Sequence, residues 1–138
     1  IVQSMKCIFY DYFYHDVVIR SLSYDFDDIE NCYYIQFVLN IGNANVEEDS
    51  IQDLGKKVKC AFRNLYYSYV DLCHNIVGDY YISYSEVNDI DPILLEYKEK
   101  MKKYLSEEIL CKLKCYSIYT NAGVIKIIAE NDIEIFDT

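Results

Sequence analysis

The chain has 138 residues, 52% of them hydrophobic and 16% aromatic, and its formal net charge at pH 7 is −10. This length and apolar fraction fit one ordinary domain with a continuous core, so we expect residues 1–138 to form a single domain. So acidic a chain repels phosphate backbones and anionic membranes, which are bound by clustered Lys and Arg, and this disfavours nucleic acid and membrane as partners.

The predicted elements are mostly strands, because the 16 tyrosines and six phenylalanines stand in alternating segments. In chain order, the candidate strands are Cys7–Tyr14, Asp16–Tyr24, Tyr33–Ile41, Val58–Leu72, Asp79–Ser85, Leu110–Tyr119, Val124–Ala129 and Ile133–Phe136. The third is apolar on both faces, which predicts a central strand covered on two sides. The fourth is too long for one strand, so we expect a bend or break near Asn64.

Two turns and one helix complete the predicted fold. Asn121-Ala122-Gly123 is typical of a hairpin with Gly at a positive φ, and residues 40–53 are polar enough for a long loop. After Asp91-Pro92, apolar residues recur at helical spacing, and Asp followed by Pro is a good helix start. The sequence therefore predicts a mainly β chain, an antiparallel β-sandwich with one amphipathic helix near residues 92–105.

Neither a membrane span nor a leader is visible in the pattern. No apolar run approaches the length of about 20 residues that a span requires. The start of the chain alternates tyrosines with charges instead of forming the apolar core of a signal peptide. Basic residues gather at 56–59 and 98–103, but acidic neighbours make each group typical of a solvated face. We expect a soluble chain; Met5 is a candidate native start, and a longer precursor with a removed signal stays open as an alternative.

The cysteines are expected to be free thiols. Six are present, namely Cys7, Cys32, Cys60, Cys73, Cys111 and Cys115. They would permit three disulfides in an oxidising compartment, but a chain with this much apolar core does not need them. No asparagine opens an Asn-x-Ser/Thr sequon. We therefore predict a cytosolic location.

Catalytic and metal-binding patterns are weak. Cys73 and His74 are adjacent, and on a strand they would point to opposite faces, so they do not form a catalytic pair. A catalytic pair of His15 with a cysteine distant in the sequence remains geometrically possible. Cys111 and Cys115 would share one strand face, but zinc needs further ligands that no nearby pair supplies. We find no phosphate loop, nucleophile elbow or metalloprotease helix. We therefore expect no enzyme and no cofactor.

The acidic segment between the second and third strands is the predicted interaction site. Asp25, Phe26, Asp27, Asp28 and Glu30 lie there, without the sixth-position Gly and late Glu of a calcium loop. An aromatic ring within a negative field suits recognition of a partner with basic and apolar groups. An ordinary solvated loop, with Phe26 packed inward to close the hairpin, is the alternative.

Several segments resemble the small poxviral host-range proteins. The run from Asp16 to Tyr24, Asp-Val-Val-Ile-Arg-Ser-Leu-Ser-Tyr, is followed by a short polar loop and a strand that opens with Cys32. Residues 62–70 resemble that family's Tyr-rich strand, and residues 79–104 its passage from strand to helix. Between Gly42 and Lys56 the chain is shorter than the family pattern, and its ending after Ile133 is short.

The resemblance implies a β-sandwich with added helices and a particular function. A member of that family counters a host antiviral restriction factor, a sterile-alpha-motif-domain protein, by binding it directly through loops at one edge, in the host cytoplasm. A second viral class also stays open, the compact helical Bcl-2-like inhibitors of apoptosis or innate signalling. For that class Asn121-Ala122-Gly123 would be a degraded groove motif, but the tyrosine alternation favours strands.

Overall fold

The computed structural model describes residues 4–6, 9–41, 56–74, 78–130 and 133–136. The strands in these ranges are β1 Ser4–Lys6, β2 Val18–Asp27, β3 Cys32–Ile41, β4 Lys56–Phe62, β5 Leu65–Leu72, β6 Tyr80–Asn88, β7 Lys114–Thr120, β8 Gly123–Ala129 and β9 Ile133–Phe136. All neighbouring pairs are antiparallel. The strand order is β1-β9-β4-β3-β2-β6-β7-β8-β5.

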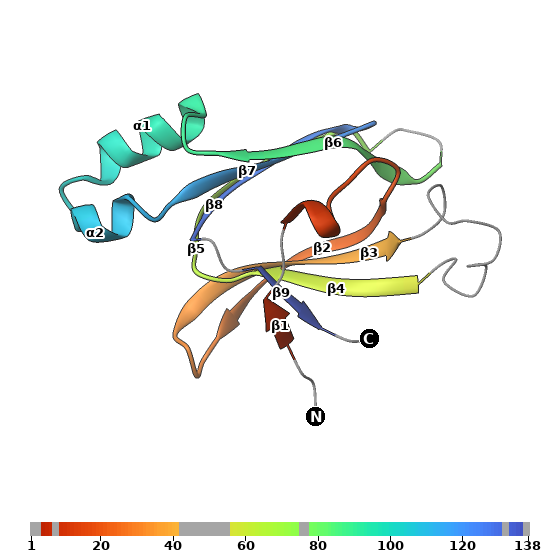
Figure 1. Cartoon of the computed structure of the whole chain (residues 1–138), viewed down its shortest axis with the longest axis horizontal. Coiled ribbons are helices and arrows are strands. Elements are labelled where there is room, and N and C mark those ends of the chain that lie inside the picture. The colour runs from red at the N-terminus through yellow and green to blue at the C-terminus, as the bar shows by residue number, and fades with distance from the viewer. Residues whose placement is uncertain (1–3, 7–8, 42–55, 75–77, 131–132, 137–138) are drawn as a thin grey trace.

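This sheet folds on itself into two layers (Figure 1). One layer contains β1, β9, β4, β3 and β2, and the other contains β6, β7, β8 and β5. They join where Val18 and Ile19 at the start of β2 pair with β6. The predicted mainly β sandwich is therefore confirmed. The predicted break near Asn64 is confirmed too, because Asn64 adopts a φ of 52° between β4 in one layer and β5 in the other.

The main core lies between the layers and is built from alternate strand positions. Ile35, Phe37 and Leu39 of β3 are fully buried, as are Phe62 of β4 and Ile118 of β7. The prediction for β3 is half right. The strand is central, but only one face is fully buried: Ile35, Phe37 and Leu39 are inaccessible, whereas Tyr34, Gln36 and Val38 on the other face are partly exposed.

Residues 7–14 were predicted as a strand, and this is wrong for the described part. Phe9–Asp11 forms a short 3-10 helix, η1, and Phe13 follows it. The rings of Phe9 and Phe13 stack 5.0 Å apart, and Phe13 meets Phe37 edge to face at 5.3 Å. On an extended strand, positions four apart also share a face but lie roughly 13 Å apart, so the contact between the two rings requires the tighter helical turn.

Two helices cover part of the outer face of the β6-β7-β8-β5 layer. Helix α1, Pro92–Met101, starts as predicted, with Asp91 accepting a hydrogen bond from the Ile93 N–H, but it ends at Met101 and not at Leu105. A second helix, α2 Glu107–Leu110, was not predicted, and β7 starts at Lys114 and not at Leu110. The apolar residues of this region form a second core against the sheet, made of Leu94, Leu110, Leu113, Cys115 and Ile128.

The hairpin between β7 and β8 has the predicted form. Gly123 adopts a φ of 143°, and a Cβ atom there would lie 1.9 Å from the carbonyl oxygen of Asp71 on β5. Glycine is therefore required both for backbone conformation and for the close approach of β5. The predicted long loop begins later than expected, because β3 continues to Ile41; its residues 42–53 lie outside the described ranges.

Candidate partner-binding site

The predicted acidic segment forms the end of the β2–β3 hairpin and its turn. Strands β2 and β3 pair from Val18↔Asn40 to Asp27↔Cys32, and residues 28–31 connect them. The Asp27 carboxylate accepts hydrogen bonds from the N–H groups of Ile29 at 2.9 Å and Glu30 at 3.1 Å. Such a turn, closed by an Asp side chain, holds its backbone in a defined conformation.

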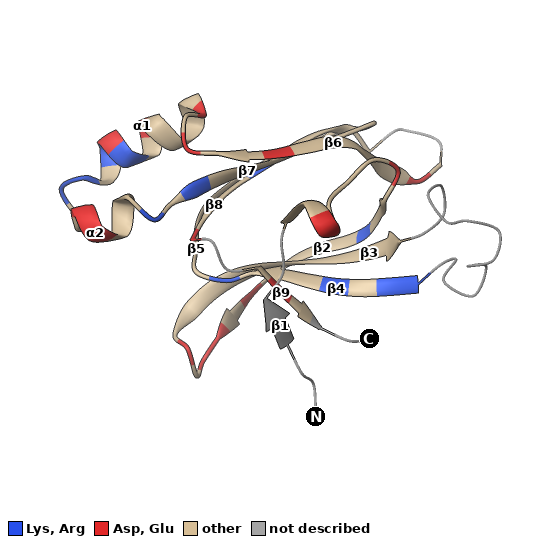
Figure 2. Ribbon diagram, viewed as in Figure 1, with Lys and Arg blue, Asp and Glu red and all other residues tan. Residues whose placement is uncertain are grey.

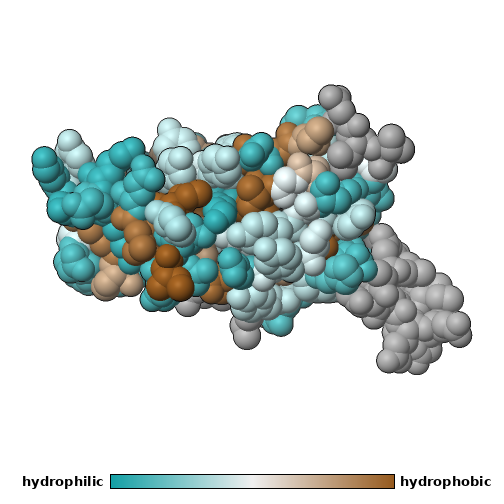
Figure 3. Space-filling view, turned by 90° about the horizontal axis from the view of Figure 1, so that it is seen from above, coloured by the Kyte–Doolittle hydropathy of each residue, from teal (hydrophilic) through white to brown (hydrophobic). Residues whose placement is uncertain are grey.

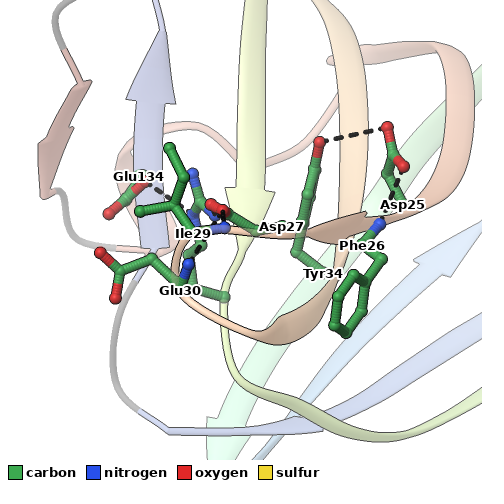
Figure 4. A network of polar contacts seen from close by, with 8 residues as sticks. Asp25, Phe26, Asp27, Ile29, Glu30, Tyr34 and Glu134 are labelled. Atoms are coloured by element: carbon green, nitrogen blue, oxygen red, sulfur yellow. Dashed lines mark hydrogen bonds and ion pairs between the residues drawn. The ribbon is translucent and has the colours of Figure 1, made fainter.

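Arg63 fixes one side of this hairpin to β9, across β4 in the same layer. The Arg63 guanidinium pairs with Asp27 and, at 3.0 Å, with Glu134 of β9. It also lies 4.9 Å from the ring centroid of Tyr34, whose hydroxyl donates to Asp25 at 3.4 Å. Figure 4 shows these contacts around the turn. Arg63 was not a predicted site residue, because it lies 36 residues from Asp27 in the chain.

Hydrogen bonds within the turn and the ion pair shift both charged groups toward ionisation. The pKa of Asp27 is lowered, first by the Glu30 N–H and then by Arg63. Burial by itself lowers the pKa of Arg63, but the hydrogen bonds to Asp27 and Glu134 outweigh it and raise that pKa. The side chains of Asp27 and Arg63 are each 19% exposed, so solvent screens the pair only in part. Asp27 therefore stabilises the turn and is not a freely exposed carboxylate.

The other side of the hairpin is aromatic and exposed. Three cross-strand pairs follow one another on this face: Leu22–Phe37, Tyr24–Ile35 and Phe26–Tyr33. It is the face whose residues Phe37 and Ile35 belong to the core. Toward the turn this face extends beyond the cover of the second layer. Phe26 is 38% exposed and Tyr33 is 63% exposed, and their rings meet edge to face at 4.8 Å. Figure 4 shows the Phe26 ring on the opposite side of the strand from the Asp25 carboxylate and the Tyr34 hydroxyl.

The five predicted residues therefore fall into two groups. Asp25, Asp28 and Glu30 are exposed acids around the turn, and Phe26 is a partly exposed ring, whereas the Asp27 carboxylate is used within the fold. Tyr33 and Ile29 were not among the predicted site residues, although Ile29 is 93% exposed at the turn. Tyr33 could have been predicted from Phe26. Once a β2–β3 hairpin is assumed, the two residues are opposite each other, so their side chains lie on the same face.

Charge is unevenly distributed over the surface. Acidic residues mark the end of the β2–β3 hairpin, while basic residues, Lys56, Lys57 and Lys59, lie on β4 of the same layer (Figure 2). Seen from above, the surface over α1, α2 and the adjoining sheet mixes small apolar areas with polar side chains (Figure 3).

The residues considered for catalysis or metal binding lie in ordinary surroundings. His74 contacts the Tyr80 hydroxyl at 2.9 Å, and His15 lies 3.1 Å from the Asp16 carboxylate. The expectation that Cys111 and Cys115 share a strand face is wrong, because Cys111 caps α2 whereas Cys115 is buried in β7. Within the described ranges, no three His, Cys, Asp or Glu side chains gather closely enough to hold a metal ion.

In the same ranges no helix has the length and apolar character of a membrane span.

Comparison with protein-family models, with curated proteins and with solved structures found no match for this chain.

Proposed function

We propose that this protein acts by binding another protein, without catalysis, through the end of the β2–β3 hairpin. The observation that carries the proposal is the contrast between the two sides of the hairpin. One side is held by Arg63 on Asp27 and Glu134, while the other exposes Phe26 and Tyr33. A fixed backbone that presents exposed rings loses little conformational entropy on binding.

The chemistry of this surface indicates the kind of partner. Aromatic residues supply much of the binding energy in protein interfaces, where they become buried in pockets of the partner. The exposed carboxylates of Asp25, Asp28 and Glu30 create a negative field around these rings. Such a field speeds encounter with a basic surface and disfavours acidic partners. The partner surface should therefore combine Lys or Arg with an apolar pocket.

A narrower form of the proposal names the biological class. In this form the protein is a viral host-range or immune-evasion factor that binds and inhibits a host antiviral restriction factor in the host cytoplasm. Its support is the resemblance of the segments around β2, β3 and β6 to the poxviral host-range proteins, together with the edge loops through which that family binds. The alternative of a Bcl-2-like helical bundle does not fit a chain whose described elements are mainly strands.

Affinity capture with matched charge variants tests this proposal. The bait is the full chain, and the source is an extract of interferon-treated host cells, with proteins identified by mass spectrometry. The variant Asp28→Lys/Glu30→Lys reverses two exposed acids of the turn, and the control Glu107→Lys/Glu108→Lys reverses two exposed acids of α2. A partner should be captured by the wild type and the control and lost with the hairpin variant. Equal capture by all three chains would contradict the hairpin as the contact, and a sterile-alpha-motif protein among the lost partners would support the narrower form.

A further inference from the structure

Strand β5 is an open edge of the sandwich. It ends the strand order, and among the described strands it pairs with β8 alone. Its eight residues, Leu-Tyr-Tyr-Ser-Tyr-Val-Asp-Leu, contain a single charge, at Asp71, and neither Lys nor Pro. Folded proteins usually protect an edge of this length with such residues, because unpaired N–H and C=O groups accept further strands. An unprotected edge is therefore a candidate contact surface.

The register shows which backbone groups point outward. The N–H of Cys73 donates to the carbonyl of Ala122 at 2.8 Å, in continuation of the β5–β8 pairing in which Leu72 is opposite Gly123. In an antiparallel pair the direction of the backbone groups alternates along each strand. The N–H and C=O groups of Ser68, Val70 and Leu72 therefore face away from β8, toward the open edge.

Each face of this edge adjoins a hollow. On the outer face, a groove of about 320 Å³ separates β5 from α1 and is lined by Tyr67, Tyr69, Ile93, Glu96, Tyr97 and Lys100. On the inner face, a hollow of about 260 Å³ lies between β5 and β2, with Leu22, Val70, Leu72 and Ile125 in its wall. A strand added beside β5 would send alternate side chains to these two faces.

The edge is also continuous with the aromatic side of the hairpin. The Tyr24 hydroxyl on β2 lies 2.9 Å from the Ser68 hydroxyl on β5. Phe26 and Tyr33 follow Tyr24 on the same face of the hairpin, and their rings remain partly uncovered. The open edge of β5 therefore adjoins the aromatic side of the hairpin at Tyr24.

We infer that β5 receives an extended segment of the partner protein as an additional strand, with apolar side chains at alternate positions and Lys or Arg among the others. Backbone hydrogen bonds to β5 give the segment its register, and the hollows on both faces select its side chains. This inference rests on the proposed function, because it specifies how the partner contacts the hairpin.

Charge favours a basic segment over a second copy of the chain. Asp71 and Glu96 border the edge at β5 and α1, and Asp28 and Glu30 lie at the hairpin turn. The two linings contain two permanently charged basic residues and one histidine. Arg20 is paired with Asp79 at 2.7 Å and His74 contacts the Tyr80 hydroxyl, so Lys100 is the other cation beside these acids. A second copy with a net charge of −10 would bring further carboxylates to the same place.

Selection of random peptides displayed on phage tests the inference, with the full chain as target. Enriched peptides should alternate apolar residues with Lys or Arg. The variant Val70→Pro removes one outward N–H that the β5–β8 pairing does not use, whereas Val70→Thr keeps it. Val70→Pro should weaken peptide binding by about tenfold or more, as expected when a ladder hydrogen bond and its register are lost, and Val70→Thr should change it little. In the wild type, amide hydrogen exchange at Ser68 and Val70 should slow when the peptide binds.

Several outcomes would overturn the inference. These are enriched peptides without alternation, equal binding to a folded Val70→Pro variant, or unchanged exchange at Ser68 and Val70. If ultracentrifugation shows dimers that Val70→Pro abolishes, the occupant is a second copy and not a partner. If a cellular partner is lost with Asp28→Lys/Glu30→Lys but retained by Val70→Pro, the hairpin proposal stands and the added strand is wrong.

Discussion

Lys126 on β8 donates a hydrogen bond of 2.6 Å to one oxygen of the Asp91 carboxylate, and the other oxygen accepts from the Ile93 N–H at 2.9 Å. One side chain therefore caps α1 and attaches the first turn of the helix to the sheet. Asp91 is 6% exposed, so water screens this pair weakly. Burial by itself lowers the pKa of Lys126, but the pairing with Asp91 raises it.

Replacing Asp91 should lower the free energy of unfolding, and the loss should be larger when both the helix cap and the ion pair with Lys126 are removed than when the cap is kept. Asp91→Ala removes the cap and leaves Lys126 without its carboxylate, and we expect a loss of about 2 to 4 kcal/mol in the free energy of unfolding. Asp91→Asn keeps a capping oxygen, so the loss should be smaller, about 1 to 2 kcal/mol. Denaturant unfolding of both variants measures the difference. Equal losses would show that the cap contributes nothing beyond the ion pair.

The two described glycines with positive φ allow a matched comparison. Gly123→Ala places a Cβ against the Asp71 carbonyl, so β5 or the hairpin must move, and we expect a loss of about 2 to 4 kcal/mol. Gly78 also has a positive φ, 99°, but a Cβ there meets nothing within 4 Å. Gly78→Ala should therefore cost only the backbone strain, about 1 to 2 kcal/mol. The measurement is thermal or denaturant unfolding. Equal stability of the two variants would contradict the steric role of the Asp71 carbonyl.

The Asp27–Arg63 pair should make stability depend on pH. The pKa of Asp27 is lower in the folded chain than its ordinary value of 3.8, so the unfolded chain binds its proton first as the pH falls. The stabilisation is complete above about pH 5, decreases as the pH falls through the ordinary value, and is lost below the folded pKa. Asp27→Asn should be less stable than the wild type at neutral pH, and the difference should narrow toward pH 3. A difference that stays constant from pH 7 to pH 3 would rule out this origin.

Thiol reactivity should separate the cysteines by burial. Cys73 and Cys111 are exposed, whereas Cys60 and Cys115 are buried, and within the described ranges none of the four forms a disulfide. Burial also raises the pKa of the Cys115 thiol, so less reactive thiolate forms. A thiol reagent should label Cys73 and Cys111 in the native protein, and Cys60 and Cys115 only after unfolding. Peptide mapping identifies the labelled sites. Disulfides in the unreduced protein would instead indicate an oxidising compartment and oppose the cytosolic prediction.

The parts of the fold that follow local rules could be predicted from the sequence. Alternation identified β2, β3, β6, β8 and β9 to within a few residues, and Asp91-Pro92 identified the start of α1. The errors occur where tertiary contacts decide the conformation. Alternation places Phe9 and Phe13 on one face of a strand, but it does not reveal the 3-10 turn that stacks their rings in the core. Helix α2 has only four residues, too few for a helical period to be recognised.

The site was predictable in position but not in the roles of its residues. Composition identified the acidic turn with its Phe, yet the sequence does not distinguish an exposed carboxylate such as Asp28 from one used by the fold. Asp27 is used because Arg63 reaches it from the end of β4, and this contact depends on the strand order. Charge reversal at Asp27 would therefore disturb the fold, so exposed acids are the appropriate positions for testing association.

Phe26 allows the hairpin proposal to be tested at a single position. Its ring is 38% exposed and packs on Tyr33, so Phe26→Ala should lower the free energy of unfolding by only about 0.5 to 1.5 kcal/mol. If the ring anchors a partner, the same change should cost about 1 to 3 kcal/mol of binding free energy, mostly through faster dissociation. Tyr104→Ala, which removes a ring that is 77% exposed near α1, is the control and should alter neither quantity much. Binding kinetics with a captured partner, measured beside thermal unfolding, give both values. Unchanged affinity together with a large loss of stability would show that Phe26 only closes the hairpin, and the interaction surface would then have to lie elsewhere.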